Sequence, residues 1–284
     1  MNIIITGATG FIGKHLTASL SNKHNILAVS REIRDSAPNS YAIDLRNKDQ
    51  VSSFSDQLAL GKRIDVIVHL ASRFVTAGNI NDLSVLYDNI KITENIVLLV
   101  KKVDANKLIN FSTIAVYPNI SGEFSEASTV RTSENTECIY GLSKICSENL
   151  FNYLLKENNI SVVHLRLSQV DGDGMRNDRI IPIMMNELKN FNKITVFGNG
   201  ERISNFIHIN KVVSLVDMFV ENDASGIYNV GDEHQSYFEL AKILIKKYGN
   251  QESTIVKKNE GSRSQFILNI SKLNAFMNKI QMNN

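Results

Sequence analysis

The sequence contains no tryptophan, three prolines and two cysteines in 284 residues. Cys138 and Cys146 do not have a Cys-x-x-Cys spacing, so we interpret them as ordinary reduced thiols of a cytoplasmic protein. The formal net charge is only +2. A protein dedicated to nucleic acid or to membrane surfaces needs a strong basic excess, so neither partner is expected.

Long apolar runs are also missing. No uninterrupted apolar run reaches about 18 residues, and no basic leader precedes the first apolar run at Ile3–Ile5. These features predict a soluble, intracellular protein. With 43% hydrophobic residues the chain can bury a substantial core, which argues against a disordered protein.

Short apolar runs alternate with segments whose apolar residues recur at helical spacing. This alternation predicts an α/β fold with a doubly wound parallel sheet of the Rossmann type, covered by helices on both faces. The strand-like runs are Ile3–Thr6, Ile26–Ser30, Tyr41–Asp44, Val66–Leu70, Leu108–Ser112 and Val162–Leu167. The helical segments are Ile12–Leu20, Val51–Leu60, Leu83–Val103 and Ile139–Leu155.

The pattern becomes irregular after about residue 168, where loops rich in Gly, Asn and Asp occur at 171–174 and 198–200. We predict a dinucleotide-binding domain over 1–167 and a smaller, irregular substrate-binding region over 168–284, of which about 205–231 returns to the first domain. No proline- or glycine-rich linker separates the two parts, so they are expected to pack as one unit.

Three glycines follow the first strand in the segment TGATGFIG, at Gly7, Gly10 and Gly13. Such a loop makes a tight turn and lets the backbone approach a pyrophosphate, while the helix that starts near Phe11 directs free N–H groups at the phosphates. The alternative is a glycine turn that binds nothing, but the position between a strand and a helix disfavours it. We predict a dinucleotide site that includes Phe11 and Ile12.

The end of the second strand bears on the choice of cofactor. A site for NAD usually has an acid there, which accepts from the ribose 2′-hydroxyl. Here Ser30 and Arg31 occupy the place, Glu32 comes one position late, and Arg34 is near. Arg31 can pair with a 2′-phosphate, so NADP is favoured and NAD remains the alternative. Asp44, at the end of the third strand, is placed to accept from the adenine amino group.

The segment YGLSK places Tyr140 and Lys144 on one face of a helix, four residues apart. A phenol has a pKa of about 10, so proton transfer near neutral pH favours a lowered pKa. The ammonium of Lys144, together with the positive ring of an oxidised nicotinamide, is predicted to lower it. The pair alone is common by chance, but it follows a phosphate loop and five alternating strands.

The chain resembles an extended short-chain dehydrogenase/reductase of the NAD-dependent epimerase/dehydratase group, which acts on nucleotide sugars. The resemblance covers essentially the whole chain. It rests on motifs that occur in order: TGATGFIG, DVIVHLAS, FSTIAVY, YGLSK, LRLSQVDGDG, NFIHI and GIYNVGD.

This resemblance implies a catalytic set of Thr113, Tyr140 and Lys144. Thr113 would hold the substrate oxygen that is oxidised or reduced, and Lys144 would also hold the nicotinamide ribose. No metal ligand is expected in the site. The further cofactor contacts that it implies are Leu45, Leu70, Ala71, Asn89 and Ser112. The substrate contacts that it implies are Gln169, Arg202, Asn205, His208 and Arg263.

Departures from the family pattern affect substrate and chemistry. The family often has Arg-Asp-Phe where this chain has Ser204-Asn205-Phe206, so Arg202 or Arg263 must supply the charge for a nucleotide diphosphate. Val170-Asp171-Gly172 stands where the family has Val-Tyr-Gly, which alters the pocket wall. Family dehydratases carry Asp-Glu after the threonine, whereas Ile114 and Ala115 cannot transfer protons, so 4,6-dehydration is disfavoured.

Several functions remain open. The favoured one is reduction of a nucleotide-linked 4-keto-(6-deoxy)hexose at the expense of NADPH, with Tyr140 as the proton donor. The alternatives are 4-epimerisation with NAD, other carbonyl or sugar chemistry, and an NAD(P)-binding sensor without turnover. The resemblance also implies a homodimer through a four-helix bundle of the helix after Asp82 and the Tyr140 helix, unless those helices only pack on the sheet.

Overall fold

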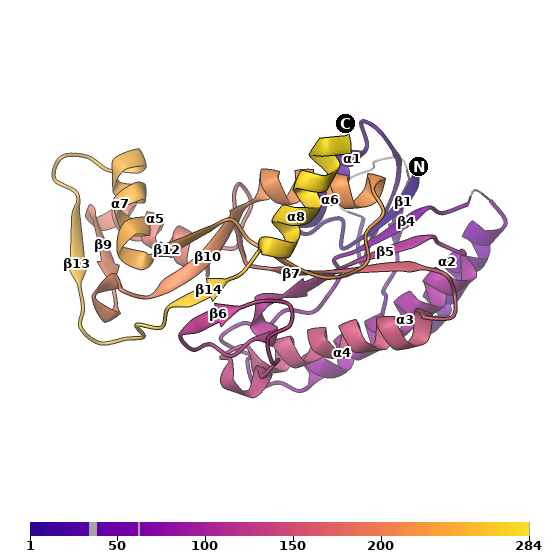
Figure 1. The fold of residues 1–284 in the computed structure, drawn as a ribbon, viewed down its shortest axis with the longest axis horizontal. Helices are drawn as coiled ribbons and strands as arrows, with labels where there is room; N and C mark the ends of the chain where they lie inside the picture. The colour runs from indigo at the N-terminus through magenta and orange to yellow at the C-terminus, as the bar shows by residue number, and fades with distance from the viewer. Residues whose placement is uncertain (34–38, 62, 284) are drawn as a thin grey trace.

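The computed structural model describes residues 1–33, 39–61 and 63–283. Its centre is a sheet of seven strands in the order β11-β7-β5-β4-β1-β2-β3 (Figure 1). Every neighbouring pair in this sheet is parallel, which confirms the doubly wound α/β fold predicted from the sequence. The strands are β1 Asn2–Thr6, β2 Asn25–Ser30, β3 Ser40–Ala42, β4 Val66–His69, β5 Lys107–Thr113, β7 Ser161–Leu167 and β11 Gly226–Val230.

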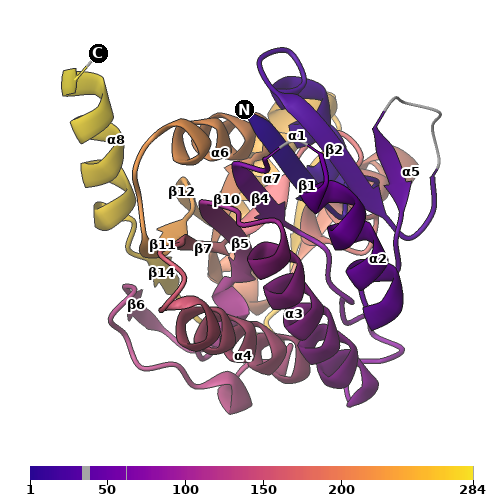
Figure 2. The ribbon, with the colours of Figure 1, turned by 90° about the vertical axis from the view of Figure 1, so that its right-hand side faces the viewer.

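Helices cover both faces of this sheet, which is why its strands are apolar on both sides. In β1, Ile3 and Ile5 pack with α1, α6 and α8, whereas Ile4 packs with α2, α3 and α4. Figure 2 shows these two layers. The helices of the first layer are α1 Phe11–Leu20, α6 Ile209–Glu221 and α8 Ser271–Asn283. Those of the second layer are α2 Lys48–Ala59, α3 Ser84–Lys102 and α4 Cys138–Leu155.

The remaining elements form a smaller, irregular region at one end of the sheet (Figure 1). It contains a three-stranded sheet and a two-stranded sheet, with a core between α5 and α7. A further pair, β6 and β14, lies beside them and joins the two parts of the chain. The elements are β8 Gln169–Asp171, β10 Ile203–His208, β12 Glu233–Ser236, β9 Lys193–Val196, β13 Thr254–Lys257, β6 Gly122–Phe124, β14 Phe266–Leu268, α5 Ile180–Phe191 and α7 Tyr237–Tyr248.

The order of the strands places a crevice at the carboxyl ends of β1 and β4. After β1 the chain adds β2 and β3 on one side of this strand and then crosses to add β4 on the other side. Ligands of open α/β sheets bind at such a point, where the order of the strands reverses. Gly7 follows β1 and Leu70 follows β4, so both lie at this crevice. None of the helices in the described ranges has the length and apolar character that a bilayer span requires.

Candidate active site

The glycine loop has the geometry of a phosphate cradle. Gly7 has a φ of +71°, and a Cβ at this position would lie 2.9 Å from the amide nitrogen of Ala71. A Cβ at Gly13 would lie 2.2 Å from the carbonyl oxygen of Gly7, so the loop and α1 pack too closely for any side chain. Gly10 caps α1 without a side chain to occupy the first N–H groups. These donors can receive a pyrophosphate, so the loop fits the phosphates of a dinucleotide.

The carboxylate predicted to meet adenine is already held by an arginine that the sequence analysis missed. Arg46 Nη2 lies 2.6 Å from Asp44 Oδ2, and Arg46 Nε lies 3.0 Å from Asp44 Oδ1. Arg46 lowers the pKa of Asp44, and the exposed Arg31 contributes to the same effect. Leu45 is buried, and its carbonyl accepts from the Asn95 side chain at 2.7 Å. Arg34 lies outside the described residues.

A close backbone contact brings the Tyr140 helix onto the end of β5. A Cβ at Gly141 would lie 2.3 Å from the carbonyl oxygen of Ala115, so only glycine lets α4 approach this far. Lys144 Nζ donates to the carbonyl of Phe111 at 2.9 Å and lies 5.7 Å from the centre of the Tyr140 ring. Thr113 ends β5, and its hydroxyl accepts from the Ala115 amide at 3.2 Å. The glycine of YGLSK is therefore required for the close packing of α4 against the residues that follow β5.

The pKa values of Tyr140 and Lys144 are both shifted, mainly because the two side chains are buried. Burial raises the pKa of the Tyr140 phenol above its ordinary value, and the Ser72 hydroxyl and the guanidinium groups of Arg179 and Arg176 oppose this shift. Burial lowers the pKa of Lys144 to about 8, with Glu148 acting in the opposite direction. The YGLSK motif predicts a lowered pKa for Tyr140, whereas the pKa is raised in this structure because desolvation of the phenolate dominates.

Phe74 and its loop form a wall beside Tyr140. The two rings lie with their centroids 5.2 Å apart, and Phe74 remains 47% exposed. Asn89 holds the neighbouring residue by its backbone: its Oδ1 accepts from the Arg73 amide at 2.7 Å, and its Nδ2 donates to the Arg73 carbonyl at 3.0 Å. The same Nδ2 donates to Ser143 Oγ at 2.9 Å, which ties the loop to α4. The predicted cofactor residue Asn89 is therefore engaged in bracing this loop.

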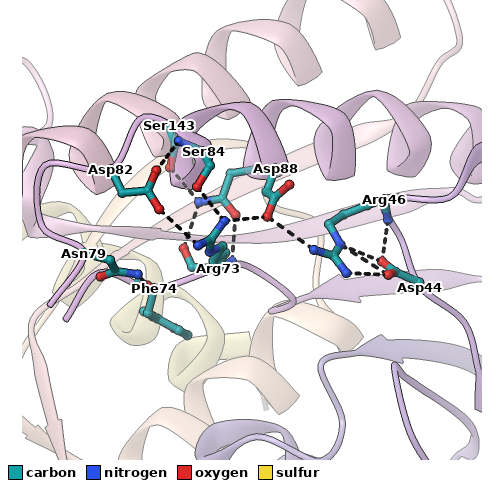
Figure 3. Close-up of polar contacts among 10 residues, drawn as sticks. Asp44, Arg46, Arg73, Phe74, Asn79, Asp82, Ser84, Asp88 and Ser143 are labelled. Atoms are coloured by element: carbon teal, nitrogen blue, oxygen red, sulfur yellow. Dashed lines mark hydrogen bonds and ion pairs between the residues drawn. The ribbon is translucent and has the colours of Figure 1, made fainter.

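Figure 3 shows how the side chain of Arg73 continues this bracing. Its Nη1 donates to Ser84 Oγ at 2.8 Å and to Asp88 Oδ2 at 2.9 Å, while Nη2 lies 3.2 Å from Asp82 Oδ2. Asp88 is shared with Arg46, whose Nη1 lies 3.4 Å from the same oxygen. A continuous series of charged contacts therefore connects the end of β3 to the loop that carries Phe74.

Beneath β5 lies a buried polar network that includes the predicted cofactor residue Ser112. Its hydroxyl donates to Glu148 Oε1 at 2.5 Å, and Glu148 Oε2 pairs with Arg166 Nη2 at 2.7 Å. Arg166 also donates to the Tyr117 hydroxyl at 2.9 Å, and that hydroxyl donates to Asn229 Oδ1 at 2.8 Å. The side chain of Ser112 is thus directed into the core between β5 and α4. Leu70 and Ala71 follow directly after the end of β4, and their contact with a cofactor stays a prediction.

The predicted substrate residues differ in how free their side chains are. Asn205 is buried, donates to the Phe266 carbonyl at 2.8 Å and accepts from the Leu268 amide at 2.9 Å, an arrangement that does not favour substrate contact. Gln169 donates to Ser204 Oγ at 2.7 Å, across β8 and β10. Ser204, which stands where the family often has arginine, is therefore engaged with Gln169.

Of the other three predicted substrate residues, His208 and Arg263 are exposed and Arg202 is half-buried. Arg202 lies over the Tyr237 ring at 5.5 Å. His208 caps α6 by accepting from the Asn210 amide at 3.2 Å. Arg263 is exposed and lies 3.8 Å from Glu201. Arg202 Nη2 also lies 3.5 Å from Asn119 Oδ1, and Arg263 also donates to Asn259 Oδ1, so both guanidinium groups already have a polar partner within the chain.

Two arginines near Tyr140 were missed because a sequence does not reveal which loop folds over which helix. Arg179, at the start of α5, pairs with Glu137 at 3.0 Å, one turn before Tyr140 on α4. Arg176 lies in the same loop and pairs with Asp178. Both raise the positive potential at the phenol. The loop also meets α1, where His15 Nε2 contacts the Asp173 carbonyl at 2.9 Å.

Several known proteins are similar to this chain in sequence. The model of the NAD dependent epimerase/dehydratase family matches residues 3–231. A dTDP-D-glucose 4,6-dehydratase of Dictyostelium discoideum is 26% identical in an alignment of 278 residues that covers 86% of this chain and 61% of that protein. This chain thus spans less than two thirds of that relative. A dTDP-4-dehydro-6-deoxyglucose reductase of Escherichia coli is 28% identical over 248 residues, with 81% and 76% covered.

A solved structure shares the fold over almost the whole chain. The UDP-N-acetylglucosamine 4-epimerase from Bacillus cereus superimposes with a TM-score of 0.82 at 21% identity, covering 98% of this chain and 90% of that one. The three similar proteins carry out a dehydration, a reduction and an epimerisation. Similarity alone therefore leaves the reaction open, and the residues at the site have to distinguish among the three.

Proposed function

The chain belongs to the NAD dependent epimerase/dehydratase family, and from this membership we propose that it is an NAD(P)-dependent oxidoreductase acting on a nucleotide sugar. The favoured reaction is reduction of a 4-keto-(6-deoxy)hexose linked to a nucleoside diphosphate. The apolar pair Ile114 and Ala115 beside Thr113 offers no acid and base for elimination, which argues against 4,6-dehydration, and Arg31 in place of an acid after β2 favours NADPH and therefore reduction over epimerisation. Hydride transfer at a single carbon needs only Thr113, Tyr140 and Lys144.

The electrostatics of Tyr140 favour the direction of reduction. Because burial raises its pKa, the phenol is protonated at neutral pH and can donate to a developing alkoxide. Thr113, at the end of β5, would orient the substrate oxygen by its hydroxyl. Lys144 would hold the nicotinamide ribose from the same helix face. A bound nicotinamide cofactor supplies the hydride.

Substrate binding is assigned to the smaller region. Arg202 and Arg263 supply positive charge for the diphosphate in place of the arginine that Ser204 replaces, with Gln169 and His208 nearer the sheet. Asn205 is assigned a bracing role because its amide is engaged with β14. NADP is the favoured cofactor because Arg31 can meet a 2′-phosphate.

A second candidate is 4-epimerisation with NAD. Arg46 is the main cause of the lowered pKa of Asp44 and Arg31 makes a smaller contribution, so Arg31 is near a carboxylate that partly offsets its attraction for a 2′-phosphate. The same three catalytic residues would serve both reactions. We also propose that the chain forms a homodimer through α3 and α4, where Tyr87 and Tyr153 are exposed by 64% and 70%.

The test is turnover of dTDP-, GDP-, CDP- and UDP-linked 4-keto-6-deoxyhexoses with NADPH and with NADH. A Tyr140→Phe variant should lose about 10²–10⁴-fold in turnover, and Tyr248→Phe, at an exposed tyrosine of α7, is the matched control. Steady turnover by Tyr140→Phe would refute the assigned mechanism. Binding of both cofactors without consumption of any sugar would support a sensor, and interconversion of sugars without net oxidation of cofactor would support the epimerase.

A further inference from the structure

A cluster of ionisable side chains lies between the turn after α1 and the face of α6, on the part of the fold opposite the catalytic helix. His24 precedes β2, and Asp217 and Glu221 are four residues apart on α6, so they share one face of that helix. Their ligand atoms all lie within 4.8 Å of one another. The cluster is separate from every residue assigned to the cofactor or the substrate.

Three polar atoms of this cluster are buried without a hydrogen-bond partner among the described residues. They are both ring nitrogens of His24 and Oδ1 of Asp217. The His24 side chain is only 6% exposed, and its Nε2 lies 3.8 Å from Asp217 Oδ1 and 3.8 Å from Glu221 Oε1. Buried polar groups are nearly always satisfied, and leaving one unmatched destabilises the folded chain. The imidazole therefore points at two carboxylates that it does not reach.

We propose that His24, Asp217 and Glu221 bind a first-row divalent metal ion of the Zn²⁺ class. Zinc takes imidazole nitrogen at about 2.0–2.1 Å and carboxylate oxygen at about 2.0–2.2 Å, which separates neighbouring ligand atoms by about 3.4 Å in a tetrahedron. The separations of 3.8 Å are close to this value and too long for a hydrogen bond. The imidazole ligand disfavours Mg²⁺ and Ca²⁺, which prefer oxygen alone.

Lys23 is the natural competitor of the ion. Its Nζ lies 2.6 Å from Asp217 Oδ2 and 4.0 Å from Glu221 Oε1. It binds the second oxygen of Asp217 and leaves Oδ1 facing His24. One ammonium and two carboxylates leave the cluster with a net negative charge, to which a divalent cation is attracted. The lysine side chain is 56% exposed, so it can move into solvent at little cost.

Occupation of the site would fasten the turn between α1 and β2 to α6. Because α1 begins at the glycine loop, the ion would stabilise the helix that presents its N-terminus to the cofactor. A ligand that binds only the folded state stabilises it. The unfolding temperature then rises with the logarithm of the ligand concentration, once that concentration exceeds the dissociation constant. The expected role is structural, and its readout does not depend on activity.

The experiment uses the tag-free, full chain after treatment with EDTA. Calorimetric titration with Zn²⁺ should show one site, and the unfolding temperature should rise with added Zn²⁺ but not with Mg²⁺ or Ca²⁺. His24→Gln and Asp217→Asn should abolish both effects. His15→Gln, which changes another histidine at the surface of α1, should keep them.

Lys23→Met sharpens the test because it removes only the competitor. Zn²⁺ should bind this variant several-fold more tightly than the wild-type chain. The proposal is overturned if Zn²⁺ changes neither heat nor unfolding temperature in the wild-type chain, or if His24→Gln responds as the wild-type chain does. Weaker binding by Lys23→Met would also overturn it, because the lysine would then belong to the site.

Discussion

Glu148 and Arg166 form an ion pair in the interior of the protein, with Oε2 and Nη2 2.7 Å apart and both side chains only 2% exposed. Glu148 is on α4, one turn after Lys144, and Arg166 is on β7. The pair therefore connects the catalytic helix to the sheet. Because Glu148 also receives the hydroxyl of Ser112, the position of α4 against β5 depends on this carboxylate.

Loss of one partner should destabilise the protein strongly. Arg166→Met leaves the Glu148 carboxylate buried without its counter-charge, and we expect the free energy of unfolding to fall by roughly 3–5 kcal/mol. Urea unfolding followed by circular dichroism measures it. The double variant Arg166→Met/Glu148→Leu should recover much of the loss, because no unpaired charge remains. A loss below about 1 kcal/mol in the single variant would show that the pair is unimportant.

Lys144 should make stability depend on pH. Its pKa in the folded state is lowered to about 8, below the ordinary 10.5, so between these values the unfolded chain binds more protons. The free energy of unfolding contributed by this group therefore rises with pH through that window. The stability of the wild-type chain relative to Lys144→Met should increase from pH 8 to pH 10 in urea unfolding. Parallel pH profiles for the two proteins would contradict the lowered pKa.

Arg73 should act through Phe74. Its guanidinium meets Ser84, Asp88 and Asp82, and this holds the loop that places the Phe74 ring against Tyr140. We expect Arg73→Met to lower kcat/KM on the order of tenfold, since small displacements at a reacting centre are costly.

A double-variant comparison separates this effect from a general loss of stability. Arg73→Met added to Phe74→Ala should cause no further loss of kcat/KM, because the positioned ring is already gone. Lys102→Met, which removes a contact between α3 and Asp56 of α2, is the control and should keep full activity. Independent, additive losses from Arg73→Met and Phe74→Ala would show that Arg73 acts by another route.

Arg31 should decide between the two cofactors. If its guanidinium meets a 2′-phosphate, Arg31→Ala should weaken NADPH by about tenfold, or about 1.4 kcal/mol, and leave NADH nearly unchanged. Fluorescence titration gives both dissociation constants. Arg63→Ala is the control, because Arg63 contacts Asn106 away from the crevice. Tighter binding of NADH than of NADPH by the wild-type chain would instead favour the epimerase.

The sequence alone was sufficient for the fold, because its evidence is local. Continuous apolar strands with helical segments between them are typical of a doubly wound sheet, and both this sheet and the family resemblance are confirmed. The glycine loop could also be recognised from the sequence, because its three glycines lie within seven consecutive residues. The structure shows that a Cβ at Gly7 or Gly13 would meet the backbone of a neighbouring residue. The assignments of individual site residues stay predictions.

Tertiary structure decided everything that depends on partners distant in sequence. Arg46 occupies Asp44, Asn89 braces Arg73, and Asn205 is engaged with β14. The raised pKa of Tyr140 has the same origin, since desolvation depends on what packs around the phenol. A sequence pattern shows which groups can transfer protons or bind charge. Only the folded chain shows how much water surrounds each group and which opposite charge lies within reach, and these determine its chemistry.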